Sequence, residues 1–272
     1  MLSHRRRIFA FLTLAVCLGA QSIPLASQEP SLTEEQIKEF LLKAKVMQHK
    51  QTPRGITAPS RLTLNDGALT HDAAFQSIDE RKPVMQLDSG TEMNFRDSYH
   101  FNIAAYELAK LLGLGDMIPV TVERRCLGAL GSLSWWVAAK MDEMDRRDKK
   151  VEPPDQNEWN KQINKMRVFS QLVYDIDRNR TNMLITADWK LIMIDFSRAF
   201  RMHHKLENPK TLGMCDRQLL DKLRQLDGAQ VLEKTKPHLT KDEVKAVMAR
   251  RDLIVAYFER LIAEKGEEKV LY

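Results

Sequence analysis

The sequence contains few cysteines, and this scarcity excludes folds that depend on a disulfide framework or on structural zinc. Only three of the 272 residues are cysteine. A disulfide-rich scaffold needs several pairs, and none of the Cys and His spacings matches a structural zinc site. If an N-terminal segment that contains Cys17 is removed, Cys126 and Cys215 remain. The sequence leaves open whether these two thiols pair.

The sequence also lacks a long apolar run in its body and a strong excess of one charge. A membrane-spanning helix needs about 20 apolar residues, and no segment after the N-terminus is that long. The net charge is +5, but three of the basic residues, Arg5, Arg6 and Arg7, lie at the start. The rest is nearly neutral, which argues against a nucleic-acid partner, because such binding requires a basic surface.

The N-terminus has the pattern of an export signal. The three arginines precede an uncharged run from Ile8 to Ala20, and Leu18-Gly19-Ala20 supplies small residues for cleavage. We expect residues 1–20 to be the signal, with a boundary that can extend to about residue 28. The alternatives are a buried helix or a lipid anchor at Cys17. The mature protein would be secreted or periplasmic, or in the secretory pathway of a eukaryote, with no transmembrane span after signal removal.

Residues 31–141 mix strand and helix patterns, which predicts a small lobe that contains a sheet. A capping box at Ser31 or Thr33 begins a helix that is expected to run to about Met47. Alternating apolar residues predict strands over 61–64 and 73–78, joined by a turn at 65–67. Helical periodicity follows over 99–114, and two more strands are expected over 120–122 and 133–137. Residues 79–97 are polar and predict a loop.

The second half is mainly helical. Residues 142–157 are charged and contain prolines, so we expect a linker, with a larger lobe over 158–272. Two short strands, 183–185 and 191–194, form a predicted hairpin inside that lobe. The remaining elements are predicted helices over 158–174, 216–226 and 240–251, with a last helix to about 264. This order predicts an α+β protein with a sheet-containing N-lobe and a helical C-lobe.

The predicted hairpin carries the most informative residues. Asn182 enters its first strand and Asp195 leaves its second, so antiparallel pairing brings both side chains to one end. An amide oxygen beside a carboxylate suits Mg²⁺ or Mn²⁺. Asp177 lies five residues before Asn182. The catalytic Asp and the metal-binding Asn of kinases have the same spacing in sequence. The spacing therefore indicates phosphoryl transfer; an ordinary hairpin with polar turn residues is the structural alternative.

These residues also resemble known kinase motifs. Asp177–Asn182, with the sequence DRNRTN, and Ile194–Phe196 resemble the Asp-Arg-His-x-x-Asn and Ile-Asp-Phe-Gly signatures of phosphoinositide 3-/4-kinases. The layout is similar to that of HipA-type kinases and secretory-pathway protein kinases, and the close match covers about twenty residues. The resemblance implies a two-lobed protein kinase-like fold that binds ATP with Mg²⁺ or Mn²⁺. It implies Asp177 as the catalytic carboxylate, and Asn182 and Asp195 as metal ligands with catalytic roles.

A looser resemblance in the N-lobe implies the nucleotide-binding residues. Gly55 is similar to the phosphate-loop region, and Glu107 to the helix glutamate that pairs with a strand lysine. The strand that ends at Met141 resembles the approach to the adenine-contacting hinge. Gln76 stands where the family has its lysine, Asn179 replaces the family's His, and Ser197 replaces its Gly. Lys82 and Arg61 are candidate replacement cations that the sequence does not place.

Two functions follow from these observations. The first is an ATP- and metal-dependent phosphotransferase that acts on an alcohol group of a protein, lipid or small molecule. Transfer of AMP instead of phosphate also fits the motifs. The second is a pseudokinase-type module that binds nucleotide or a partner without transferring phosphate, because Gln76 carries no charge to grip phosphates.

Overall fold

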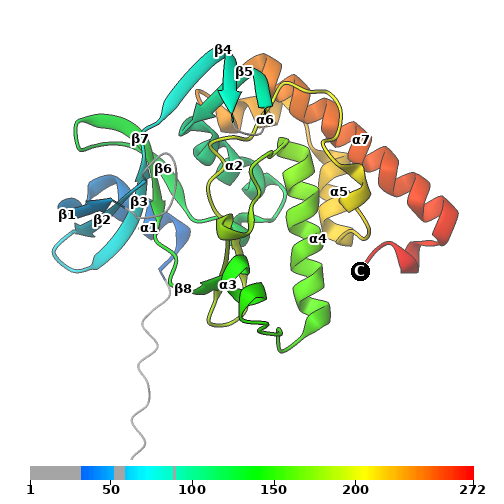
Figure 1. Ribbon diagram of the computed structural model, residues 1–272, viewed down its shortest axis with the longest axis horizontal. Helices are drawn as coiled ribbons and strands as arrows, with labels where there is room; N and C mark the ends of the chain where they lie inside the picture. Colours follow the sequence, from blue (N-terminus) through cyan, green and yellow to red (C-terminus); the bar gives the residue numbers. More distant parts are fainter. Residues whose placement is uncertain (1–31, 52–58, 88–89) are drawn as a thin grey trace, which may run out of the picture. The chain divides into compact units, whose positions relative to one another are not determined.

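A five-stranded antiparallel sheet forms the core of the N-lobe in the computed structural model (Figure 1). The structure describes residues 32–51, 59–87 and 90–272, so the expected export signal and Gly55 lie outside the described residues. Residues Thr33–Tyr272 form one compact unit that contains both lobes. In sheet order the strands are β1 (Lys45–Gln51), β2 (Ser60–Asn65), β3 (Thr70–Gln76), β7 (Ala129–Trp135) and β6 (Thr121–Cys126).

One face of this sheet is covered by α1 (Glu34–Lys43), and apolar side chains from both fill the space between them. Thr33 and Gln36 form the predicted capping box at the start of the helix. The helix ends at Lys43, four residues before the predicted Met47, because Val46 pairs with Leu64 of β2 as part of strand β1. The buried residues of this small core include Phe40, Leu41, Leu62, Leu64, Phe75 and Leu133.

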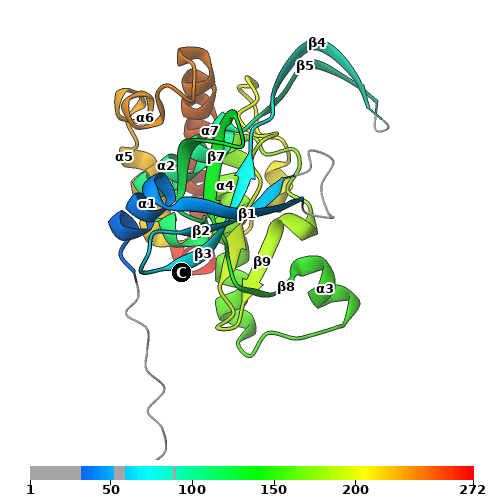
Figure 2. The same ribbon diagram turned by 90° about the vertical axis from the view of Figure 1, so that its left-hand side faces the viewer.

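A long hairpin replaces the loop predicted over 79–97. Strands β4 (Asp79–Leu87) and β5 (Gly90–Ser98) pair with each other and form a separate two-stranded sheet. The hairpin projects beyond the five-stranded sheet in two perpendicular views (Figure 2). Its outer part is exposed on both faces, so it lacks the apolar alternation by which a strand is recognised in sequence.

Helix α2 (His100–Leu111) lies between the N-lobe sheet and the helices of the C-lobe. It contacts strands β6 and β7 on one side and helix α6 (Gly228–Thr235) on another. Eight of its residues are buried, among them Phe101, Ala104 and Leu108. Burial on more than one face is what a helix between two layers requires.

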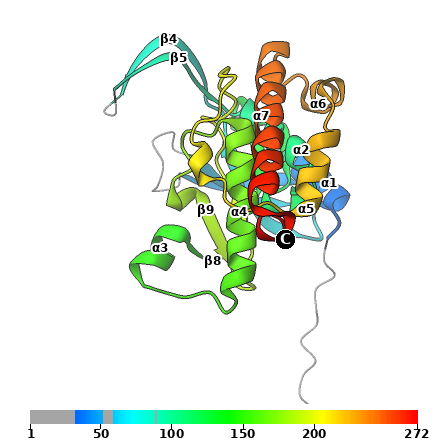
Figure 3. The same cartoon turned by 90° about the vertical axis from the view of Figure 1, so that its right-hand side faces the viewer.

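The C-lobe consists of helices packed around α4 (Gln156–Val173), together with a three-stranded sheet (Figure 3). The predicted linker contains a helix, α3 (Glu143–Asp148). Helix α6 was not predicted; it begins at Gly228, a poor helix former, after its cap Asp227. The other elements are β8 (Ala139–Asp142), β9 (Met183–Thr186), β10 (Leu191–Met193), α5 (Arg217–Gln225) and α7 (Lys241–Lys265).

Helix α7 is one continuous helix of 25 residues, although two helices were predicted with a break near Arg251. The Thr240–Glu243 capping box begins it as predicted. Arg250, in the middle of this helix, is fully buried. Its guanidinium donates to the carbonyl oxygens of Leu172, at 2.7 Å, and Arg201, at 2.8 Å, so it joins α7 to α4 and to the segment that follows β10.

Both remaining cysteines are free and buried. Cys126 lies in the N-lobe core and Cys215 in the C-lobe core, so they do not form a disulfide bond. Within the part of the chain that the structure describes, no helix combines the length and hydropathy needed to cross a bilayer.

Candidate active site

The β9–β10 hairpin brings Asn182 and Asp195 to the same end. Met183 pairs with Met193, and beyond this pair the amide of Ile194 donates to the carbonyl of Asn182 at 3.1 Å. Asp195 is the next residue and has a positive φ of 56°, a left-handed conformation that ends the strand. The backbone register therefore places the two candidate metal ligands where the sequence predicted them.

Arg178 holds the two functional loops together. Its guanidinium donates to the carbonyls of Asn182, at 2.8 Å, and Ile194, at 2.6 Å, and lies 4.3 Å from the centre of the Phe196 ring. Asp175, which is completely buried, pairs with the same guanidinium at 2.5 Å. Because one rigid group bonds both sides of the hairpin end, it fixes their relative positions. Sequence analysis included Arg178 only as a motif residue and did not anticipate this role.

Asp177 lies in the same loop, and its side chain is exposed. Its backbone carbonyl accepts from the amide of Asn182 at 3.2 Å, and its carboxylate accepts from the amide of Asn179 at 3.3 Å. Asn179, which replaces the family's His, also caps the short turn before Asn182. The candidate catalytic carboxylate is thus positioned by the loop backbone while its side chain remains accessible.

A cleft of about 410 Å³ begins at this carboxylate. Asp177 and Arg178 line one part of it, and Arg167 and Gln171 of α4 and Glu207 line other parts. The lining thus contains both acidic and basic side chains. A polar acceptor molecule could enter here beside Asp177.

Gln76 at the end of β3 does not meet a glutamate. Its side-chain oxygen accepts from the amide of Asn102 on α2 at 2.5 Å. The oxygen of Asn102 accepts in turn from the backbone N–H of Phe196 at 2.7 Å. Two neutral amides therefore occupy the place where the resemblance implies a Lys–Glu ion pair. They link strand β3 directly to the segment of Asp195 and Phe196 that follows β10.

Glu107 lies elsewhere, which corrects its expected position opposite Gln76. It forms ion pairs with Lys38 of α1, at 3.5 Å, and with Lys110, at 3.7 Å. Asn102 and Glu107 are five residues apart on one helix, which is roughly 140° of rotation, so they cannot share a face. Sequence analysis missed Asn102 because an asparagine near a helix N-terminus is usually a capping residue.

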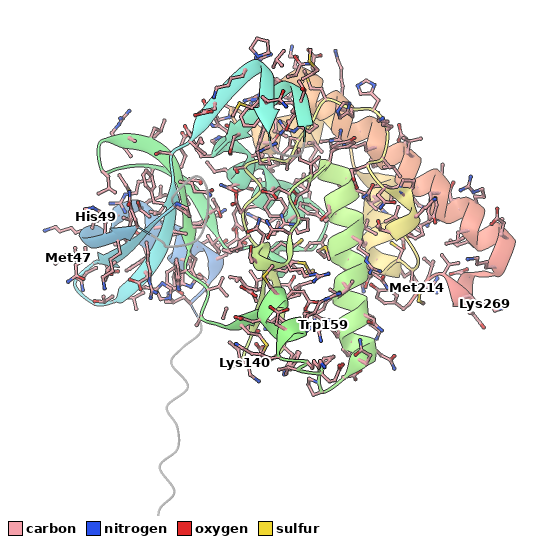
Figure 4. All side chains as sticks on the ribbon, in the orientation of Figure 1. Met47, His49, Lys140, Trp159, Met214 and Lys269 are labelled. Atoms are coloured by element: carbon pink, nitrogen blue, oxygen red, sulfur yellow. The ribbon has the colours of Figure 1, made fainter. Side chains whose placement is uncertain are left out.

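Met141 lies in strand β8, where it pairs with Ile185 of β9 and packs against the C-lobe core. The connection between the lobes, residues 136–138, precedes it. Lys140 lies on the same strand, and its ammonium is 5.4 Å from the centre of the Trp189 ring. Figure 4 shows Lys140 and Trp159 at the α3 end of the C-lobe. Met141 therefore belongs to the C-lobe sheet and not to the connection between the lobes.

The two candidate cations occupy different places. Arg61 on β2 pairs with Ala74 of β3, two residues before Gln76, so Arg61 and Gln76 lie on the same face of the sheet. Its guanidinium contacts Asp72 and lies 4.3 Å from the Trp136 ring. Lys82 lies on the projecting hairpin and pairs with Glu80. Of the two, only Arg61 lies on the five-stranded sheet.

Asp97 on β5 is a further carboxylate at this site that sequence analysis missed. It is buried, and one of its side-chain oxygens has no hydrogen-bond partner among the described residues. Burial raises the pKa of Asp97, and the nearby charge of Asp195 raises it further. The hydrogen bond with Ser197 and the charges of Arg198 and Arg201 act in the opposite direction. A divalent cation would relieve this repulsion, so the donor set of Asn182, Asp195 and Asp97 fits a hard metal ion.

Comparison with solved structures defines the class of fold. Hydra Fam20, solved with a sugar, has a TM-score of 0.64 and 16% identity, covering 88% of this chain and 91% of that one. A Golgi casein kinase has a TM-score of 0.61 and 13% identity, with 88% and 77% covered. The structure of the Golgi casein kinase with Mn and ADP has a TM-score of 0.62 and 14% identity, and the match covers 88% of this chain and 78% of that one. No protein-family model matches the sequence, and neither does any curated protein.

The chain therefore has an atypical protein kinase-like fold, as the sequence motifs predicted. The two-lobed α+β architecture, with a sheet-containing N-lobe and a mainly helical C-lobe, is likewise confirmed. At these identities the likeness establishes the fold and leaves the reaction to be argued from the site.

Proposed function

We propose that this protein is an ATP-dependent phosphotransferase that uses Mg²⁺ or Mn²⁺ and acts on an alcohol group. The observation that carries the proposal is the β9–β10 register, which sets Asn182 and Asp195 at one end of the hairpin, beside Asp177. The fold supports it, because a Golgi casein kinase of similar fold was solved with Mn and ADP. A bound divalent cation would neutralise the phosphate charges.

The residues of this chain have separate roles in the proposal. Asn182 and Asp195 would hold the metal ion, and Asp97 would add a third oxygen donor. Asp177, exposed at the mouth of the cleft, would orient or deprotonate the acceptor hydroxyl. Arg178 positions both loops without touching the reacting groups. The neutral Gln76–Asn102 pair leaves the phosphates to the metal ion and to a cation such as Arg61.

The domain limits and the location of the protein are part of the same proposal. Residues 31–135 would form the nucleotide-binding lobe and 139–272 the lobe with the catalytic and metal loops. The connection would be residues 136–138 rather than the predicted 142–157, because β8 pairs with β9 of the C-lobe sheet. Residues 1–20 would direct export. The similar structures include a Golgi protein by its name, which is consistent with a secretory location.

A second function is favoured by one specific observation. Gln76 brings no charge and is already bonded to Asn102, so the site can bind nucleotide without aligning it for transfer. In this alternative, ATP with Mg²⁺ raises the melting temperature of the protein but is not consumed, because binding to the native state stabilises it.

The test compares Asp195→Asn with Asp188→Asn in the same hairpin. Asp188 is an exposed turn residue between β9 and β10 that bonds Thr186 and Lys190, so its substitution controls for disturbance of the hairpin. ATP consumption and self-phosphorylation are measured with Mg²⁺ and with Mn²⁺, and mass analysis identifies phosphate or AMP on the product. We expect Asp195→Asn to lower turnover by about 100-fold or more and Asp188→Asn to change it little.

Equal turnover in both variants would reject the phosphotransferase. Stabilisation by nucleotide without turnover, lost in Asp195→Asn, would establish the binding module in its place. No shift in melting temperature with any nucleotide would reject both functions.

A further inference from the structure

Three side chains from distant parts of the sequence converge at a second place. His100 is the first residue of α2, Glu123 lies on β6 of the N-lobe sheet, and His238 lies between α6 and α7 of the C-lobe. One ligand atom from each lies within 4.8 Å of the others. This cluster therefore joins the N-lobe sheet, the helix between the lobes and the C-lobe.

The three atoms have the geometry of a metal site. The Nδ1 atoms of His100 and His238 are 3.0 Å apart, and they lie 3.7 and 3.9 Å from Oε1 of Glu123. A point equidistant from the corners of such a triangle lies about 2.1 Å from each corner, which is the distance that zinc takes to imidazole nitrogen and to carboxylate oxygen.

The three ligand atoms of the cluster also have too few hydrogen-bond donors among themselves to satisfy their lone pairs. Two imidazole Nδ1 atoms at 3.0 Å can share one proton, and two charged rings would repel each other. Oε1 of Glu123 already accepts the hydroxyl hydrogen of Tyr99 at 3.0 Å. A single cation at the centre would satisfy all three ligand atoms at once.

Surrounding groups hold these ligands in place. Tyr99 fixes the Glu123 carboxylate, and the other ring nitrogen of His100 lies 3.9 Å from a carboxylate oxygen of Asp79. The backbone of His238 is anchored by its amide, which donates to the carbonyl of Thr235 at 2.8 Å. At 3.9 Å the Asp79 carboxylate is a nearby charge behind the ring rather than a hydrogen-bond partner.

We propose that His100, Glu123 and His238 bind one zinc-class divalent ion that clamps the N-lobe sheet to the C-lobe. Two imidazoles and one carboxylate suit zinc rather than Mg²⁺, which prefers oxygen ligands alone. The side chains are only partly buried, at 22%, 30% and 10% exposed for His100, Glu123 and His238, so an ion can enter and a water can complete the coordination. The cluster shares no residue with the hairpin site and does not depend on the proposed function.

The experiment titrates Zn²⁺ into chelator-treated, purified protein by calorimetry and follows Co²⁺ binding by its visible absorption. The variants are His238→Gln and Glu123→Gln, and the matched control is His204→Gln, an exposed histidine outside the cluster. We expect one Zn²⁺ per chain, an affinity lower by more than about 100-fold in both variants, and no change in the control. Zn²⁺ should raise the melting temperature of the original protein and of the control only.

Two results would overturn the proposal. The first is Zn²⁺ binding of equal affinity in the original protein and in both variants, which would leave the cluster as a hydrogen-bonded histidine pair. The second is loss of Zn²⁺ binding in Asp195→Asn or by competition with excess Mg²⁺, which would assign the ion to the hairpin site. Glu123→Gln keeps the shape of the side chain, so the test remains decisive if His238→Gln fails to fold.

Discussion

At the scale of single residues, the site depends on an asparagine that the motifs did not predict. Asn102 bonds Gln76 on β3, Ser132 on β7 and the backbone of Phe196, next to Asp195. A lysine and a glutamate would make this connection with charges, but here two amides make it with short hydrogen bonds. Buried amide networks of this kind are costly to break, because each lost bond leaves an unpaired polar group.

We therefore predict different costs for Asn102→Ala and Glu107→Ala. Asn102→Ala should lower the free energy of unfolding by about 1–3 kcal/mol, because the N–H of Phe196 and the oxygen of Gln76 lose their partners. Glu107→Ala should cost less than about 1 kcal/mol, since its ion pairs are partly exposed and Lys38 and Lys110 keep Glu34. Urea unfolding of the two variants measures the difference. An equal loss would show that the amide network contributes nothing particular to stability.

At the scale of elements, the β9–β10 hairpin end and helix α1 are held by contacts between residues far apart in the sequence. The hairpin end is fixed by Arg178, and α1 is fixed to α2 by charges. Glu34 at the start of α1 pairs with Lys38, at 3.0 Å, and with Lys110 of α2, at 2.6 Å. Burial alone would raise the pKa of Glu34, but Lys110, the Tyr106 hydroxyl and Lys38 together lower it to about 2.

This lowered pKa predicts a stability that depends on pH. A carboxylate whose folded pKa lies below its usual 4.5 stabilises the fold above that pH, and the contribution is lost as the pH falls towards 2. Glu34→Gln should lower the free energy of unfolding at pH 7 by about 1–2 kcal/mol, a value reduced for partial exposure, and by much less near pH 2–3.

The matched control is Glu39→Gln on the same helix, whose partner Lys43 is exposed. It should change the free energy of unfolding by less than about 0.5 kcal/mol at either pH. Urea unfolding at both pH values checks the two variants. A Glu34→Gln loss that is the same at both pH values would show that the charge is not the cause.

At the scale of the whole folded unit, a single carboxylate joins the projecting hairpin to the segment that follows β10. Glu92 on β5 contacts both Arg198 and Arg201, the latter at 2.5 Å. Burial lowers the pKa of Arg201 to about 10, although the charge of Glu92 acts in the opposite direction. The charged form of the Arg201 guanidinium is therefore stabilised by Glu92. Both arginines also lie over the ring of Phe95.

We predict that Glu92→Gln lowers the free energy of unfolding by about 2–3 kcal/mol, somewhat below the loss for a fully buried pair. The substitution leaves the two desolvated arginines with Asp97 as their remaining nearby counter-charge. The control is Glu80→Gln on the same hairpin. Glu80 pairs with exposed Lys82, so this substitution should cost less than about 0.5 kcal/mol. Chemical denaturation measures both. Similar values for the two variants would mean that the Glu92 contacts are not needed to hold the hairpin.

Local patterns in the sequence determined much of this fold. The capping boxes at Thr33 and Thr240, the helical periodicity of α2 and α4 and the hairpin between Asn182 and Asp195 are all set by residues close together in the chain. The kinase-like architecture followed from the same short motifs. Such features are predictable because their hydrogen bonds and apolar spacing lie within one element.

Tertiary structure alone decided the rest. Strand β1 and the hairpin β4–β5 exist because partner strands supply their hydrogen bonds, and a polar sequence does not reveal that pairing. The exchange of Glu107 for Asn102 depends on which side of α2 faces the sheet. The meeting of His100, Glu123 and His238 spans three distant segments, and such contacts are fixed only when the two lobes pack together.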